Sequence, residues 1–439
     1  MVIYSCEKCG KTFKQKGHYT KHLQRKTPCD NIKDKIEKIV ENKVDELVEE
    51  KLQQLVETGE IEIINKNLIT QSKDDTNQSI ETMESNRPMK AISLFSGMGG
   101  DSLGIHEAGI ELVAYSEIEK VFQKTHALNF ENCELLGNGN IINTSDEEFM
   151  KYKDEVDLIF AGFPCQGFSQ AGKKLPDDPR NTLFREFLRS ATIIQPKYII
   201  GENVKGLLNR VTGEGRKYID IIQEEFENIG YKIYTKVMKC NLHGIPQNRQ
   251  RLIIVGIKSE LNQSFEFPEE QENNTNLKDI IQFSMDGALK IEPDDFDMKS
   301  IPEECIIKDM NNEEYPSEEG PKAHPNLVLL AKAKDYEYKG QIFPRRIHFG
   351  KRIPVGGEII DIRKPLNTII CTYARQPRFF VPLQNKHGYF LRCLLPDELK
   401  QIQGFPKDYK ICGDKSKQIV QIGNAVPPPL IKLVISKLI

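Results

Sequence analysis

The sequence predicts an α/β protein built on a doubly wound, mostly parallel sheet, with a smaller irregular domain and a separate N-terminal part. Three observations support this prediction. Apolar, β-branched runs alternate with amphipathic stretches between residues 89 and 257, the order of a parallel sheet with helices on both faces. Residues 258–388 lack this alternation, and residues 1–88 differ in composition from both.

Composition limits the class of protein. The chain has 439 residues, of which 38% are hydrophobic and 28% charged, enough for two or three domains with buried cores. The N-terminus lacks a secretory pattern and no apolar run is long enough to span a bilayer, which predicts an intracellular protein of the cytoplasm or nucleus, away from membranes. Its ten cysteines are then expected to be buried, metal-bound or catalytic rather than disulfide-bonded.

Residues 1–30 predict a small metal-binding unit, with the sequence YSCEKCGKTFKQKGHYTKHLQRKTPC. Cys6 and Cys9 form a CxxC pair, and His22 and Cys29 follow at spacings suited to tetrahedral Zn²⁺. The segment resembles a C2H2-type zinc finger with cysteine as the last ligand. His18 could replace His22, and a disordered basic tail with chance cysteines is the alternative. The excess of Lys and Arg here suits phosphates, so the unit is expected to contact DNA or a partner protein.

Residues 31–88 are interpreted as a helix followed by a flexible linker. Apolar residues recur at steps of three and four between residues 32 and 56, which predicts one amphipathic helix. Its apolar stripe must either dock on the main domain or pair weakly with a second copy. The polar stretch that follows is typical of a linker.

The main domain opens with a strand, a glycine turn and a helix in KAISLFSGMGGDSLGIHEAGI. Gly97, Gly99 and Gly100 would let the backbone approach a ligand at a helix N-terminus. A second strand ends at Glu117, about twenty residues later, where an acidic side chain can accept bonds from ribose hydroxyls. A glycine turn without a ligand is the alternative.

Two further residues follow predicted strands. Cys165 follows DLIFAGFP in a stiff loop, and Glu202 lies at the end of PKYIIGENV. The carboxyl ends of parallel strands meet at one edge of a sheet. We therefore expect the glycine turn, Glu117, Cys165 and Glu202 to converge.

Residues 89–439 resemble the C5-cytosine DNA methyltransferases. The resemblance rests on seven motifs that occur in the family's order: LFSGMGG, SEI, GFPCQGFS, ENV, QNRQR, KPLNTI and QIGNAVPP. The resemblance implies a fold of the S-adenosylmethionine-dependent methyltransferase type. It also implies a DNA (cytosine-5-)-methyltransferase, the enzyme of restriction-modification systems, which takes a methyl group from S-adenosylmethionine and acts on a cytosine flipped out of double-stranded DNA.

The resemblance assigns the catalytic roles. The Cys165 thiolate would add to carbon 6 of cytosine and so activate carbon 5. Glu202 would hold a proton at N3 and bond the 4-amino group, and Arg249 and Arg251 would lie beside the nucleophile and the base. The alternatives are a buried structural thiol for Cys165 and a solvated strand edge for the two arginines.

The resemblance also implies a cofactor pocket. Its residues would be Phe95, Gly97, Gly99, Gly100, Glu117, Ile118, Asn140, Ile141, Pro164, Leu183, Asn424 and Val426. The family usually has an acidic residue for the adenine amino group, whereas this chain has Asn140. Asn424 and Val426 predict that residues 389–439 return to the catalytic domain begun by residues 89–257.

Residues 258–388 correspond to the family's target recognition domain. Its basic and aromatic stretches supply candidate contacts to base edges or phosphates. With Ser169 from the loop after Cys165, the candidates are Arg345, Arg346, His348, Lys351, Arg352 and Thr368.

Two other functions remain open from the sequence. The tRNA-directed branch of the same superfamily shares PCQ and ENV, although the long variable region and GFPCQGFSQAG favour DNA. A catalytically silent nucleic-acid-binding scaffold would keep only the fold, and the intact Cys165, Glu202, Arg249 and Arg251 argue against it.

Overall fold

The structure is a computed structural model, and the chain divides into two units, Met1–Arg87 and Pro88–Ile439. It describes residues 4–5, 12–13, 16–23, 87–164, 183–272, 274–293, 298–315, 323–332, 335–338, 340–344, 347–351 and 356–439. The predicted helix at residues 32–56 and most of the linker therefore lie outside the described residues. In the first unit, β1 (Tyr4–Ser5) pairs antiparallel with β2 (Thr12–Phe13), and α1 (Lys16–Leu23) follows.

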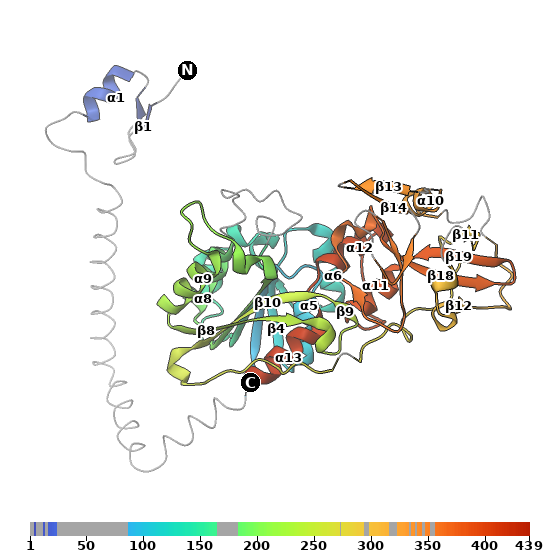
Figure 1. Cartoon of the computed structure of the whole chain (residues 1–439). Coiled ribbons are helices and arrows are strands. Elements are labelled where there is room, and N and C mark those ends of the chain that lie inside the picture. Colours follow the sequence, from blue (N-terminus) through green and yellow to red (C-terminus); the bar gives the residue numbers. More distant parts are fainter. Residues whose placement is uncertain are drawn as a thin grey trace, which may run out of the picture. The chain divides into compact units, whose positions relative to one another are not determined.

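The second unit is organised around a seven-stranded sheet in the order β5-β4-β3-β6-β7-β10-β8 (Figure 1). The strands are β3 (Lys90–Leu94), β4 (Glu111–Ser116), β5 (Glu134–Leu135), β6 (Leu158–Ala161), β7 (Tyr198–Val204), β8 (Tyr231–Lys239) and β10 (Gln250–Lys258). Neighbours from β5 to β7 are parallel, and β10 is antiparallel to both β7 and β8. The predicted doubly wound, mostly parallel sheet is confirmed.

Helices cover both faces of this sheet because successive strand residues point to opposite sides. Ile92 of β3 joins a core cluster with α8 (Phe184–Ile194) and α9 (Tyr218–Asn228). Ala91, its neighbour, joins the cluster on the opposite face with α5 (Gly100–Glu107) and α13 (Pro428–Leu438). The remaining α-helices of this sheet region are α6 (Lys120–Asn129) and α7 (Asp146–Met150).

A second, six-stranded sheet is formed by residues 289–393, a region without helix-strand alternation in the sequence. Its strands are β11 (Leu289–Ile291), β12 (Ile307–Lys308), β15 (His348–Phe349), β16 (Glu358–Ile359), β18 (Phe379–Asn385) and β19 (Gly388–Cys393). Nearby elements are α10 (Pro325–Lys332), the pair β13 (Asp335–Tyr338) and β14 (Gln341–Pro344), and β17 (Leu366–Asn367), which pairs with β9 (Gln247–Asn248). Three of the six strands have only two residues, so tertiary packing defines this sheet more than strand periodicity does.

The C-terminal segment returns to the first sheet through α11 (Pro396–Ile402), α12 (Lys415–Asn424) and α13. Among the described residues, one segment, Lys415–Leu438, is apolar and long enough for a membrane span, and its most apolar 18-residue window has a mean hydropathy of 1.3. The segment is broken between α12 and α13, and 56% of that window is buried within the protein. Leu430 and Ile431 pack in the core with Ile105 of α5, so this segment is a core element.

Candidate functional site

The turn after β3 has an unusual backbone that its glycines permit. Phe95 and Gly97 both have φ 58°, in the left-handed region that side chains disfavour. Gly100 begins α5, and a Cβ atom at this position would lie 2.1 Å from the carbonyl oxygen of Val426. The predicted residues Gly100 and Val426 thus bring the N-terminal turn and the C-terminal segment into contact.

Glu117 joins the first two strand ends. Its carboxylate accepts hydrogen bonds from the backbone N–H of Gly97 at 2.9 Å and of Glu119 at 2.7 Å. Burial raises the pKa of Glu117 above its ordinary value, although these bonds act in the opposite direction. The carboxylate therefore fixes the glycine turn against the end of β4.

A cavity of about 450 Å³ lies at the carboxyl ends of these strands, within the size range of small-molecule sites. The predicted cofactor residues that line it are Phe95, Gly97, Glu117, Ile118, Asn140, Ile141, Pro164, Leu183 and Asn424. Gly99, Gly100 and Val426 are not among its lining residues. Glu202, Arg249 and Arg251 line the same cavity, so the structure brings the predicted cofactor and catalytic residues together.

The cavity wall contains apolar side chains that the protein does not cover. Ile118 is 64% exposed and Ile142 is 60% exposed, and both line the cavity. The side-chain oxygen of Asn140 accepts a hydrogen bond from the N–H of Ile142 at 3.2 Å, which caps a short turn at residues 141–143. Exposed apolar surface beside polar groups fits a nucleoside such as that of S-adenosylmethionine.

Glu202 and Arg251 form an ion pair in the wall of the cavity. Arg251 of β10 stands opposite Val204 of the neighbouring strand β7, and its Nε lies 2.6 Å from Oε1 of Glu202. Their side chains are only 13% and 11% exposed. A partly buried pair of this kind is held in one orientation and can present both a cation and a carboxylate to one ligand.

Asn203 was not predicted from the sequence, although it is the centre of ENV. Its side-chain amide is buried and donates to the carbonyl oxygen of Phe163 at 3.1 Å. Its oxygen accepts from the N–H of Val204 at 2.9 Å. Asn203 therefore fixes the backbone two residues before Cys165, which itself lies outside the described residues, as does Ser169.

The described cysteines do not compete for the role of nucleophile. Cys133, Cys240, Cys305, Cys371, Cys393 and Cys412 are free thiols, and none of these six lines the cavity. Burial raises the pKa of Cys240 to about 11 and that of Cys133 to about 12, which suppresses the thiolate form.

Arg249 lines the cavity, but its guanidinium is occupied by the protein backbone. The residue is 1% exposed. Its terminal nitrogens donate to the carbonyl oxygens of Ile369 at 3.0 Å and Ala425 at 2.9 Å, with longer bonds of 3.4 Å to Gly423. Arg249, which lies between β9 and β10, therefore connects this part of the chain to two distant segments.

The predicted nucleic-acid contacts are only partly described. Lys351 is exposed after β15, and the Thr368 hydroxyl donates to the carbonyl oxygen of Asn248 at 2.7 Å. Arg345, Arg346 and Arg352 lie outside the described residues.

The predicted zinc ligands are also only partly described. His22 on α1 is buried and His18 is exposed, whereas Cys6, Cys9 and Cys29 lie outside the described residues. In the part of the chain that the structure describes, no group of three or more His, Cys, Asp or Glu residues could hold a metal ion.

Comparison with known proteins agrees with this geometry. The sequence model of the family described as C-5 cytosine-specific DNA methylase matches residues 89–439. Type II methyltransferase M1.HphI of Haemophilus parahaemolyticus is 32% identical, over 77% of this chain and 83% of that protein. Type II methyltransferase M.Eco47II of Escherichia coli is 31% identical, over 79% of this chain and 78% of that protein.

Solved structures show the same fold at lower identity. Entamoeba histolytica methyltransferase EhMeth superposes with a TM-score of 0.56 at 17% identity, covering 80% of this chain and 98% of its own. A mutant of Spodoptera frugiperda DNMT2 superposes with a TM-score of 0.56 at 19% identity, covering 80% and 99%.

Proposed function

The chain belongs to the C-5 cytosine-specific DNA methylase family, and we propose that Cys165, Glu202 and Arg251 carry out its reaction. It is a DNA (cytosine-5-)-methyltransferase that uses S-adenosylmethionine. The observation that carries the assignment of roles is that one cavity is lined by Gly97 of the glycine turn, by Glu117 and by the Glu202–Arg251 pair.

S-adenosylmethionine supplies an electrophilic methyl group. The residues that would hold it are Glu117 for the ribose, Ile118 for the adenine face and the glycine turn for the amino-acid end. The exposed apolar side chains in the wall support this placement, as does the Gly97 backbone tied to Glu117.

The chain's own residues activate a cytosine that has been flipped out of the duplex. The Cys165 thiolate adds to carbon 6, which makes carbon 5 nucleophilic. Glu202, in its protonated form, donates a proton to N3, while Arg251 bonds the base and orients the Glu202 carboxyl group. After methylation, loss of the proton from carbon 5, expulsion of the thiolate and return of the N3 proton to Glu202 restore the ring. Cys165 follows Pro164, which lines the cavity, and Asn203 holds the carbonyl group of Phe163, directly before Pro164.

The test is transfer of labelled methyl from S-adenosylmethionine to mixed duplex DNA and, separately, to tRNA. We expect label at carbon 5 of cytosine in DNA, lost in Cys165→Ser. Label in tRNA alone would support the tRNA-directed alternative, and cofactor binding without any label would support a silent scaffold. The relatives named Type II methyltransferases, at about 30% identity over most of the chain, favour DNA and a restriction-modification context.

We also propose that residues 1–30 form a zinc finger with Cys6, Cys9, His22 and Cys29 as ligands. The support is the β-hairpin followed by α1 with His22 buried on it, which is the order of elements in such fingers. Metal analysis of the full chain should find one equivalent of zinc, absent from Cys6→Ser. No zinc in the unmodified chain would refute this proposal.

Three further assignments remain proposals. Residues 89–257 with 389–439 would form the catalytic domain of an intracellular enzyme, and residues 258–388 the target recognition domain. Residues 32–56 would form a helix that supports weak dimerisation. The finger would bind DNA or a partner protein.

A further inference from the structure

Asn140 lines the cavity at the strand ends, which we call the cofactor cavity, and it lies in a turn that packs against the end of β4. Gly139, the residue before it, has φ 97°, and a Cβ atom at this position would lie 2.5 Å from the carbonyl oxygen of Glu117. Ile118 follows Glu117 and is exposed in the cavity wall. Asn140 and Ile118, which follow the two residues in contact, therefore line neighbouring parts of one wall.

The side-chain amide of Asn140 is held in one orientation. Its Oδ1 atom accepts a hydrogen bond from the backbone N–H of Ile142 at 3.2 Å and so caps the 3-10 turn at residues 141–143. A rotation that exchanged the oxygen and the nitrogen would set the amide NH2 group against that N–H, donor against donor. The NH2 group, on the other side of the amide carbon, is therefore the part of the side chain left for a ligand.

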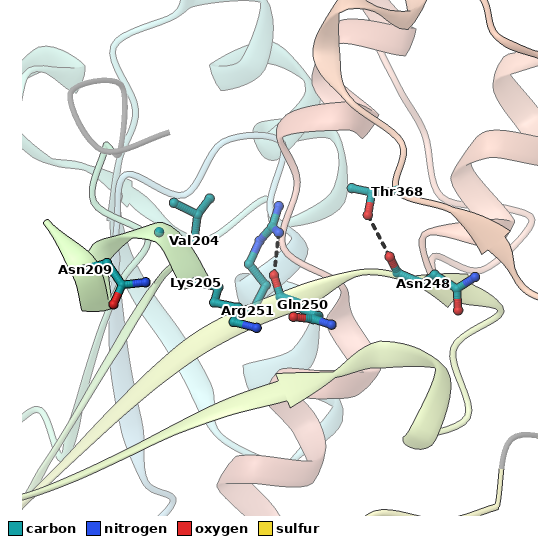
Figure 2. Close-up of a pocket in the computed structure, with 8 residues that line it drawn as sticks. Val204, Lys205, Asn209, Asn248, Gln250, Arg251 and Thr368 are labelled. Atoms are coloured by element: carbon teal, nitrogen blue, oxygen red, sulfur yellow. Dashed lines mark hydrogen bonds between the residues drawn. The ribbon is translucent and has the colours of Figure 1, made fainter. Parts of the chain in front are cut away.

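The carboxylates of the cofactor cavity are engaged elsewhere or exposed. Both oxygens of Glu117 accept backbone N–H groups. Glu202 is paired with Arg251 at 2.6 Å, and Arg251 also donates to the carbonyl oxygen of Gln250 at 2.8 Å (Figure 2). Glu119 is exposed to solvent, where competition from water weakens a hydrogen bond. The described residues that line the cavity therefore include no uncommitted buried carboxylate.

The edge of adenine carries both kinds of hydrogen-bonding group. Its 6-amino group donates, whereas the ring nitrogens N1 and N7 on either side of that group accept. We propose that the NH2 group of Asn140 donates to one of these ring nitrogens, so that the site recognises the purine ring and not its 6-amino group. The proposal rests on the proposed function, because it takes S-adenosylmethionine as the ligand.

This contact makes Asn140 a residue that sets cofactor specificity. A site that holds a buried partner for a polar group of its ligand strongly rejects analogues that lack the group, because the partner is then left unpaired. The cofactor cavity offers the amide NH2 group such a partner in a ring nitrogen, but it offers the 6-amino group no fixed acceptor. Loss of the amino group should therefore be tolerated, whereas loss of the ring nitrogen should not.

The test is calorimetric binding of analogues of S-adenosylhomocysteine, the product of methyl transfer, to the full chain. One analogue has hydrogen in place of the 6-amino group, one has carbon in place of N1, and one has carbon in place of N7. The first should bind within about threefold of S-adenosylhomocysteine, because no protein group loses a partner. One of the other two should bind roughly tenfold more weakly, because the NH2 group of Asn140 then faces a C–H group.

Asn140→Asp is the matched variant, because a carboxylate can accept the same N–H of Ile142 and so keeps the cap. Its second oxygen is an acceptor. Removal of the 6-amino group should therefore weaken binding to this variant roughly tenfold, whereas the loss caused by replacing the ring nitrogen should disappear. Glu119→Gln changes the exposed carboxylate of the same cavity and should leave all affinity ratios as they are in the unmodified chain.

Three results would overturn the proposal. They are a tenfold or larger loss for the analogue without the amino group in the unmodified chain, equal affinity ratios in Asn140→Asp and the unmodified chain, and ratios that respond to Glu119→Gln instead. A chain that binds none of the four compounds would overturn both this proposal and the cofactor assignment. Binding with the expected ratios but without methylation of DNA would refute the proposed reaction and still support the role of Asn140.

Discussion

Replacing Arg249 by Met should destabilise the fold, because this arginine ties three parts of the chain together. Its two shorter hydrogen bonds, at 3.0 Å to Ile369 and 2.9 Å to Ala425, each contribute about 1.5 kcal/mol or more for a charged donor. The substitution leaves both carbonyl groups buried without that donor. Counting only these two bonds, we expect a loss of about 3 kcal/mol in the free energy of unfolding.

The assay is urea unfolding of the full chain, followed by circular dichroism, together with steady-state kinetics. Ala425 adjoins Asn424, which lines the cofactor cavity, and Ile369 adjoins Thr368, a predicted DNA contact. The KM values for both cofactor and DNA should therefore rise. Arg249→Lys should recover only part of the stability, since one ammonium cannot reproduce the planar fork of donors. Arg185→Met, at an exposed ion pair with Glu225, is the matched control and should cost at most about 1 kcal/mol. An Arg249→Met protein of unchanged stability and KM that has lost turnover alone would refute this reasoning and make Arg249 a catalytic residue.

Three further predictions concern single side chains of the second unit. Burial raises the pKa of Asp101 to about 7 from 3.8, so the folded chain keeps a proton that the unfolded chain releases. The free energy of unfolding should therefore fall as pH rises from about 4 to about 7, by at most about 4 kcal/mol. Asp101→Asn should abolish this fall in urea titrations. A variant with an unchanged pH profile would contradict the raised pKa of Asp101. Asn203→Ala should lower turnover at least tenfold with little change in cofactor affinity, because the substitution removes the hydrogen bond to the Phe163 carbonyl, two residues before Cys165. Normal single-turnover rates in this variant would count against a positioning role for Asn203. Ile118→Ala should weaken cofactor binding several-fold, because it removes apolar surface that is exposed in the free protein. Unchanged cofactor affinity in calorimetry would exclude Ile118 from the adenine site.

The first sheet was predictable because the sequence of each strand is by itself typical of a buried strand. The strands β6, β7 and β10 are apolar runs buried on both faces, and the catalytic and cofactor candidates follow directly from strand ends. The spatial order of the strands was not predictable in the same way. The insertion of β10 between β7 and β8 depends on packing between segments, which periodicity within one segment does not report.

Other features could not be predicted because their partners are not encoded locally. The two-residue strands β12, β15 and β16 have no periodicity to detect, and residues as distant as Leu277 and Phe390 share their core. The buried position of Arg249 depends on backbone carbonyl groups of residues 369, 423 and 425. Every residue carries such a group, so the side-chain pattern gave no signal for this contact.

The central claim is that Cys165 forms a covalent bond with carbon 6 of the target cytosine. The most direct test uses duplex DNA with 5-fluorocytosine at the target and S-adenosylmethionine in excess, followed by mass spectrometry of the denatured protein. Fluorine at carbon 5 does not leave as the proton does, so the thiolate cannot be expelled and the adduct accumulates. We predict one DNA strand per chain, attached at Cys165 and absent from Cys165→Ser. An enzyme that methylates normal DNA but forms no adduct, or forms it at another residue, would contradict the account.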